Sequence, residues 1–258
     1  VVERAIEYWN GDEGKRGIVT LCWHWCPAAR YDKSKSDPWG TFYTDKTKFN
    51  LARAMNGRDP DGYQMLLDDI DAIAVQLKRL QDADVPVLWR PLHEASGGWF
   101  WWGASGADAY LQLYKLMYDR LTNVHGLNNL IWVWNGQDAA WYPGDEYVDI
   151  IGEDIYPGKH VYTSQAARFI KALSYTDTRK LITLSENGCI PDPEQLVRDN
   201  IMWSYWCVWE GEFVLKAAGF NNYSEQYTEK NMLKKAYKSD TVITRKELPD
   251  LRNYPLGD

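Results

Sequence analysis

Residues 86–134 read PVLWRPLHEASGGWFWWGASGADAYLQLYKLMYDRLTNVHGLNNLIWVW and contain one complete strand–loop–helix–strand unit. Residues 86–93 form a short apolar run that is typical of a buried strand, and residues 130–134 form another. Between them, residues 108–124 are predicted to form a helix. Strands that alternate with helices predict a parallel sheet.

The same order of elements recurs along the chain. A long polar loop is expected over residues 27–60. Strands are predicted over residues 17–25, 86–93, 130–134, 148–154, 181–186 and 203–209, and helices over 1–10, 61–82, 108–124, 165–175, 193–202 and 225–237.

These elements predict an α/β fold in which polar and aromatic residues gather where the strands end. Long loops after the carboxyl ends of six strands fit part of a (β/α)₈ TIM barrel. No Gly-rich phosphate loop follows a strand, which disfavours a nucleotide-binding sheet. Six strands do not close an eight-stranded barrel, so we expect the first two βα units to be absent from this chain. A longer polypeptide or another chain would supply them, since an open barrel exposes strand edges.

The overall composition excludes several classes of partner. The 258 residues carry 36 acidic and 29 basic side chains, for a net charge of −7. No stripe of Lys and Arg is present, so we expect neither nucleic acid nor a membrane as a partner. The opening residues 1–15 do not have the pattern of a signal peptide. Fourteen Trp and seventeen Tyr are unusual and fit both a packed core and a carbohydrate-binding groove.

The cysteines stand at positions 22, 26, 189 and 207. Alternate residues of a strand are about 6.8 Å apart, a span that a zinc ion bridges poorly. A disulfide between Cys22 and Cys26 has the same problem of reach. We favour buried free thiols, with a disulfide as the alternative.

A single carboxylic acid ends the strand over residues 86–93. Glu94 is followed within eight residues by Trp99, Phe100, Trp101 and Trp102. In an aromatic, poorly hydrated setting a carboxylic acid keeps its proton near neutral pH and serves as a general acid. The alternative is a Glu in a surface ion pair beside core tryptophans.

A second acid, Glu186, stands in the same position at the end of the strand over residues 181–186. In a barrel that lacks two front strands, Glu94 ends the fourth strand and Glu186 the seventh. Such acids face one another across the barrel mouth. A retaining glycosidase holds its two carboxyl groups about 5–5.5 Å apart.

With these motifs the chain resembles glycoside hydrolase family 26. The matching stretches are RPLHE (90–94) with Trp99, GEDIY (152–156), SENG (185–188), Trp206 in SYWCVW, His24 in CWHW, and VITRKELPDL (242–251). Many relatives in the same clan have Asn in the position of His93, directly before the Glu, which makes the HE pair of this motif fairly specific. The resemblance covers the whole chain and implies a single catalytic domain over residues 1–258, incomplete at its N-terminus.

The resemblance also implies a role for each matching residue. Glu94 would be the acid/base and Glu186 the nucleophile that forms a covalent glycosyl-enzyme. His24 and His93 would border the sugar, and Tyr156, with Asp154 nearby, would bond the nucleophile. Further candidates are Trp206 beneath the sugar, Trp99 on the leaving-group side, and Trp134, which is preferred over Trp132 as a groove residue.

Other residues near the motifs are assigned with alternatives. Arg90 is either a partner of the nucleophile's charge or part of a core ion pair. Trp101 and Trp102 cannot both face the groove, so at least one packs in the core. His125 and His160 are expected to be ordinary surface or helix-end residues.

The family implies a retaining endo-β-1,4-mannanase acting on mannan, galactomannan or glucomannan. The alternatives are an enzyme for mixed-linkage β-glucan or β-1,3-xylan, and a noncatalytic carbohydrate-binding protein. No metal or other cofactor is expected, because two carboxylates and water suffice. Expected partners are a β-mannan-type polysaccharide, the missing barrel segment, and any attached carbohydrate-binding or anchoring modules. A polymer does not readily enter cells, so we expect a secreted or cell-surface protein.

Overall fold

The computed structural model describes residues 1–11, 17–33, 37–216, 222–251 and 253–255. This part of the chain forms two compact units: residues 1–9 with 18–149, and residues 10–17 with 150–258. Six strands are present in it, as expected from the sequence. None of its helices combines the length and the apolar composition that crossing a membrane requires.

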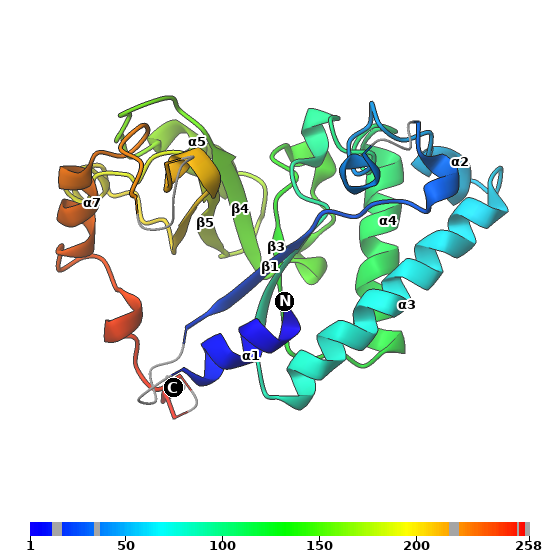
Figure 1. The fold of residues 1–258 in the computed structure, drawn as a ribbon, viewed down its shortest axis with the longest axis horizontal. Coiled ribbons are helices and arrows are strands. Elements are labelled where there is room, and N and C mark those ends of the chain that lie inside the picture. The colour runs from blue at the N-terminus through cyan, green and yellow to red at the C-terminus, as the bar shows by residue number, and fades with distance from the viewer. Residues whose placement is uncertain (12–16, 34–36, 217–221, 252, 256–258) are drawn as a thin grey trace. The chain divides into compact units, whose positions relative to one another are not determined.

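The first unit is built on three parallel strands. β1 (Val19–Trp23) pairs with β2 (Val87–Pro91), and β2 pairs with β3 (Leu130–Trp134). The helices of this unit are α1 (Val2–Asn10), α2 (Leu51–Met55), α3 (Pro60–Asp82) and α4 (Ala107–Asp119), and a π-helical turn, Arg120–Val124, continues α4. Figure 1 shows α3 and α4 on the same side of β1 and β3.

Helix α3 shows why these residues fold as they do. Its N-cap, Asp59, accepts a hydrogen bond from the Gly62 N–H, and Pro60 occupies the first turn, where a missing N–H costs nothing. One face of α3 is buried against the unit, through Met65, Leu66, Ile70, Ala74, Leu77 and Leu80. Arg120 at the end of α4 binds Asp71 of α3 at 2.6 Å, which joins the two helices.

The second unit repeats this architecture. β4 (Ile150–Ile155) pairs in parallel with β5 (Leu181–Asn187), and β5 pairs with β6 (Trp206–Val208). Its helices are α5 (Ala166–Leu173), α6 (Pro193–Asp199) and α7 (Lys230–Tyr237). All residues of β4 are buried, although the strand contains Glu153 and Asp154. Arg168 of α5 donates to Glu153, so the buried acid has a cationic partner.

The α/β class and the parallel pairing are confirmed, whereas closure into a barrel stays a prediction. Several predicted bounds differ from the observed ones, such as the strand over residues 203–209, which is observed as Trp206–Val208, and two larger details were wrong. The loop expected over residues 27–60, of which 34–36 lie outside the described residues, contains the five-residue helix α2. The last helix begins at Lys230 rather than Glu225, because the Glu225 side chain accepts from the Lys230 N–H at 3.0 Å instead of entering the helix.

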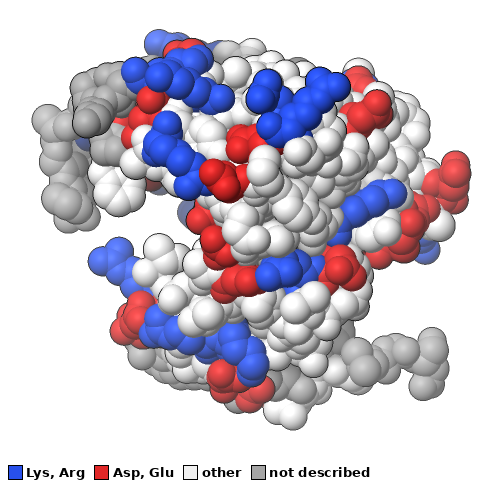
Figure 2. Space-filling view, turned by 90° about the vertical axis from the view of Figure 1, so that its right-hand side faces the viewer, with Lys and Arg blue, Asp and Glu red and all other residues white. Residues whose placement is uncertain are grey.

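Acidic and basic side chains are interspersed on the face drawn in Figure 2, and no broad area of one sign stands out on it. This distribution agrees with the mixed charge of the sequence.

Candidate active site

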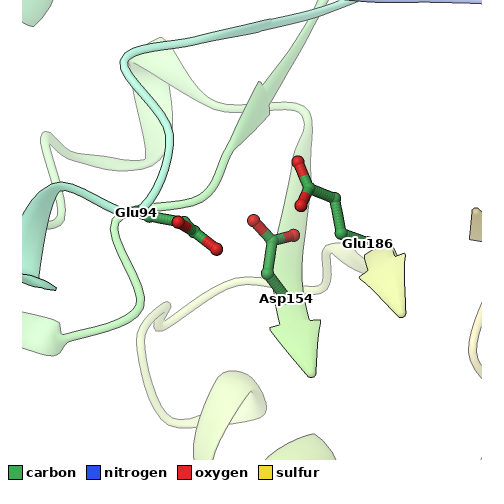
Figure 3. A group of neighbouring side chains, drawn as sticks. All are labelled: Glu94, Asp154 and Glu186. Carbon is green, nitrogen blue, oxygen red and sulfur yellow. The ribbon is translucent and has the colours of Figure 1, made fainter. Parts of the chain in front are cut away.

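Glu94, which Figure 3 labels, lies on the loop just after β2. Its φ of 53° is in the left-handed region, and Leu92 has the same φ. Non-glycine residues adopt this conformation at a cost and only where the surroundings hold them there. Here the Glu94 N–H donates to the Asn135 carbonyl at 2.7 Å, which ties the turn to the end of β3.

The carboxylate of Glu94 is held by Trp99. The indole Nε1–H donates to Glu94 Oε2 at 2.9 Å, and Trp99 itself is 47% exposed. The ring reaches the carboxylate by folding back over Gly97, where a Cβ would lie only 2.1 Å from two ring carbons. Gly97 is therefore required for this contact.

The two tryptophans that follow in the run are buried and bind backbone carbonyls near the turn. Trp101 and Trp102 are both buried, and their indoles donate to the carbonyls of Trp25 at 2.6 Å and His93 at 2.8 Å. Both therefore pack in the core. This agrees with the prediction that at least one of them does so.

His24 and His93 lie together beside this turn, with ring centroids 4.9 Å apart. Burial, the Arg90 charge and His24 hold the pKa of His93 well below its ordinary value, so its imidazole is neutral at neutral pH. His93 Nδ1 is buried, and in the described part of the chain it has no hydrogen-bond partner. A buried polar atom of this kind points to a ligand or a water molecule.

Arg90 has a partner that the sequence reading missed. Its Nη1 donates to Asn135 Oδ1 at 2.7 Å, and both side chains are buried. Asn135 thus binds Arg90 through its side chain and Glu94 through its carbonyl. Asn135 stands directly after a predicted strand, and this position could have marked it in the sequence as a candidate site residue.

In the second unit, Glu186 and Asp154 lie next to each other on β5 and β4 (Figure 3). Glu153 pairs with Leu184 but Asp154 pairs with Glu186, so Ser185 is one extra residue in β5. A bulge of this kind changes the direction of a side chain and is common beside active sites. The displaced Ser185 hydroxyl donates to Asp154 Oδ1 at 2.6 Å, a contact that sequence reasoning missed.

Tyr156, just beyond β4, donates its hydroxyl to Glu186 Oε2 at 2.6 Å. Glu186 is 4% exposed, so this hydrogen bond forms in a poorly hydrated setting. The structure therefore brings Tyr156, Asp154 and Glu186 together, as the motifs suggested.

The tryptophans expected to face the groove differ in their placement. Trp206 is half-buried on β6, and its role beneath a sugar stays a prediction. Trp134, by contrast, is fully buried, donates to the Trp141 carbonyl at 3.1 Å and packs edge-on against Tyr142. The structure thus corrects the assignment of Trp134 to the groove, because core neighbours cover the side chain at the end of β3.

All four cysteines are free thiols. The prediction that the thiols are buried is confirmed for Cys189 and wrong for the other three, which are half-buried. Cys189 donates to the carbonyls of Gly158 and Tyr227, each at 3.0 Å, and burial raises the pKa of its thiol.

Each unit thus offers a carboxylate at a strand end, held by one neutral aromatic donor. The first unit adds a neutral imidazole with an unpaired buried nitrogen among the described residues, and the second adds Asp154. Such groups suit general acid–base or nucleophilic chemistry and the binding of hydroxyl groups.

Known proteins resemble this chain over nearly all of its length. A family model described as glycosyl hydrolase family 26 matches residues 1–247. A mannan endo-1,4-beta-mannosidase of Thermothelomyces thermophilus is 46% identical over 248 residues, which are 96% of this chain and 48% of that protein. Mannan endo-1,4-beta-mannosidase A of a Piromyces species is 38% identical, over 96% of this chain and 38% of its own length. The chain therefore spans about half the length of these curated relatives or less.

Solved structures show the same similarity. A GH26-CBM35 β-(1,4)-mannanase of Podospora anserina superposes with a TM-score of 0.83 at 39% identity, over 95% of this chain and 52% of that one. A β-mannanase from a symbiotic protist of the termite Reticulitermes speratus, complexed with gluco-manno-oligosaccharide, gives a TM-score of 0.81 at 37% identity, over 96% and 72%.

Proposed function

The chain belongs to glycosyl hydrolase family 26, and from that premise we propose that it is the catalytic part of an endo-β-1,4-mannanase. The names of the relatives at 46% and 38% identity support the substrate. The observation that carries the proposal is the buried Glu186 carboxylate, held by the Tyr156 hydroxyl at the end of β5.

The proposed reaction is a double displacement with retention of configuration. Glu186 attacks the anomeric carbon, and Glu94 gives its proton to the departing glycosidic oxygen, which yields a covalent glycosyl-enzyme. Glu94 then takes a proton from water as the water attacks the anomeric carbon, and Glu186 leaves. The mechanism requires the two carboxyl groups to lie about 5–5.5 Å apart in the working enzyme.

The surrounding residues are proposed to bind the polymer. Trp99 contacts the leaving-group sugar and orients the Glu94 carboxyl through its indole N–H. His24 and His93 bind sugar hydroxyls, for which a neutral imidazole offers both a donor and an acceptor. Asp154 and Trp206 complete the proposed contacts, beside and beneath the cleaved sugar.

We further propose that the working enzyme is a closed (β/α)₈ barrel and that it acts outside the cell. The structural relatives support the first point and the size of a polysaccharide substrate supports the second. Two carboxylates and water suffice for the reaction, so the proposal includes no cofactor.

The test measures hydrolysis of soluble galactomannan by the full-length protein and by four variants. Glu94→Ala and Glu186→Ala should each lose at least about 10³-fold in kcat, since each removes a group that acts on the reacting bonds. Azide should restore turnover of an activated aryl mannoside in both variants, with inverted product configuration for Glu186→Ala. Glu146→Gln and Glu194→Gln, exposed acids of the first and second unit, are the controls and should hydrolyse normally. Normal hydrolysis by either alanine variant would show that the site assignment is wrong.

A substrate panel separates the remaining alternatives. The proposal expects release of reducing ends from mannan faster than from mixed-linkage β-glucan or β-1,3-xylan. Preference for either of those polymers would replace the substrate but keep the chemistry. Binding to mannan with no sugar released would instead favour a noncatalytic carbohydrate-binding protein.

A further inference from the structure

Tyr156 has an exposed side chain whose hydroxyl nevertheless binds a buried carboxyl group. Its side chain is 43% exposed, yet its hydroxyl sits 2.6 Å from a carboxylate oxygen of the buried Glu186. An exposed tyrosine has freedom to rotate, and ordering its side chain costs conformational entropy. A neighbouring group must therefore hold the ring in the direction of Glu186.

Phe213 contacts the ring of Tyr156. It lies in a short 3₁₀ turn (Gly211–Phe213), and its ring centroid is 5.3 Å from that of Tyr156 at an interplanar angle of 54°. This tilted arrangement is a favourable one for two aromatic rings. The contact comes from a segment beyond β6, so no local sequence pattern links it to Tyr156.

Gly188 contacts the same two rings from the chain that follows Glu186. A Cβ at this position would lie 3.2 Å from Tyr156 Cδ1 and 3.1 Å from Phe213 Cε1. Both distances are tighter than an ordinary van der Waals contact, so a side chain here would push on the pair. The absence of a side chain at position 188 thus leaves room for Tyr156 and Phe213 together.

Phe213 is itself anchored. Its ring lies 4.2 Å from that of Tyr227, whose hydroxyl donates to Glu212 Oε1 at 3.0 Å, one residue before Phe213. The Tyr227 carbonyl accepts from the Cys189 thiol at 3.0 Å, which ties it to the loop after β5. Phe213 is therefore held between Tyr227 and Tyr156.

We infer that Phe213 is a positioning residue, which holds the Tyr156 hydroxyl on the Glu186 carboxyl group. The consequence for catalysis rests on the proposed function, in which Glu186 is the nucleophile. The hydrogen bond fixes the direction of the carboxyl group, and a misplaced reacting group slows the chemical step. Loss of the positioning should therefore lower kcat with little change in KM.

The experiment measures kcat and KM on galactomannan for the full-length protein and its variants. Tyr156→Phe should lower kcat by about tenfold with little change in KM, the size expected for one lost hydrogen bond. Phe213→Ala should lower kcat in the same way, and Phe213→Tyr, which keeps the ring, should restore most of the native kcat. The double variant Tyr156→Phe/Phe213→Ala should match Tyr156→Phe alone, because Phe213 acts only through the hydroxyl.

Phe169→Ala is the matched control. Phe169 also packs through its ring in this unit, 5.0 Å from Trp203, and has no described contact with Tyr156. It should leave kcat and KM unchanged. An unchanged kcat in Phe213→Ala, or an additive loss of kcat in the double variant, would overturn the inference.

A crystal structure of the Phe213→Ala variant provides a readout that does not depend on the substrate. The inference expects the distance from the Tyr156 hydroxyl to Glu186 Oε2 to exceed its native 2.6 Å. An unchanged distance would overturn the positioning role even in an active mannanase. A lengthened distance in a protein that hydrolyses no mannan would uphold the positioning and reject the proposed function.

Discussion

The position of the Glu94 carboxyl group depends on a neighbour that has no side chain. Gly97 leaves room for the indole of Trp99, whose N–H reaches Glu94 Oε2. Neither residue could be assigned this relation from the sequence, because the contact depends on how the turn after β2 folds back on itself.

Gly97→Ala should lower kcat/KM by about tenfold, since its Cβ forces Trp99 off the carboxyl group and costs one hydrogen bond. The measurement is steady-state hydrolysis of galactomannan. In a Trp99→Ala background, where no ring remains to be displaced, adding Gly97→Ala should have no further effect. A full tenfold loss in that background would mean that Gly97 acts by another route.

Residue identities near the site were predictable where a motif was present. Glu94, Glu186, Tyr156 and His93 stand in motifs, whereas Asn135 and Phe213 stand in none; Ser185 stands in the SENG motif, but its contact with Asp154 could not be read from it. Trp134 was assigned wrongly, because a strand pattern shows which residues share a face and not whether that face is covered.

Among the elements, α5 and β4 are joined by an ion pair. Glu153 is completely buried within β4, and Arg168 Nε donates to its Oε2 at 2.9 Å. Removing one partner of a buried pair leaves a charge without compensation, which costs more than the pair itself stabilises.

Arg168→Ala should lower the free energy of unfolding by about 2 kcal/mol, measured by urea denaturation; this is less than for a fully buried pair, because the Arg168 side chain is 40% exposed. Replacing both partners, as Glu153→Met with Arg168→Met, should recover most of this loss because no buried charge then remains. Arg198→Ala is the control: Arg198 pairs with Asp199 from a 66% exposed side chain, so it should cost less than about 1 kcal/mol. A loss of that small size in Arg168→Ala would contradict the role of the pair.

At this scale the sequence predicted the order and kind of the elements well. The strand expected over residues 130–134 is observed as β3 with the same bounds, since five β-leaning apolar residues have no helical alternative. Helix α2 was missed because five residues are too few to show a period. The bulge in β5 was missed because Ser185 differs from its neighbours only through the partner strand.

For the whole molecule, the buried imidazole of His93 links stability to pH. Burial holds the pKa of His93 well below its ordinary value. As the pH falls, the His93 imidazole therefore takes up a proton in the unfolded chain but not in the folded protein. This contribution to stability is fully present above the unfolded pKa of about 6.5 and is lost as the pH falls below it.

The free energy of unfolding should therefore decrease below pH 6.5 by up to about 1.4 kcal/mol per pH unit. Urea denaturation of the protein at several pH values between 7.5 and about 5 measures this slope. His93→Gln should reduce the slope by the contribution of about one bound proton. An equal slope in the protein and in His93→Gln would show that another group is responsible.

The sequence by itself determined the alternation of strands and helices, the parallel pairing and the placement of Glu94 and Glu186 at strand ends. These features follow from local periodicity and from motifs a few residues long. Both can be read from a short stretch of sequence without knowing what the stretch packs against. Only the tertiary structure decided which groups meet: Trp99 over Gly97, Arg90 on Asn135, Ser185 on Asp154, and Phe213 against Tyr156. Many of these contacts join segments far apart in the chain, and their geometry depends on packing and register that no local pattern encodes.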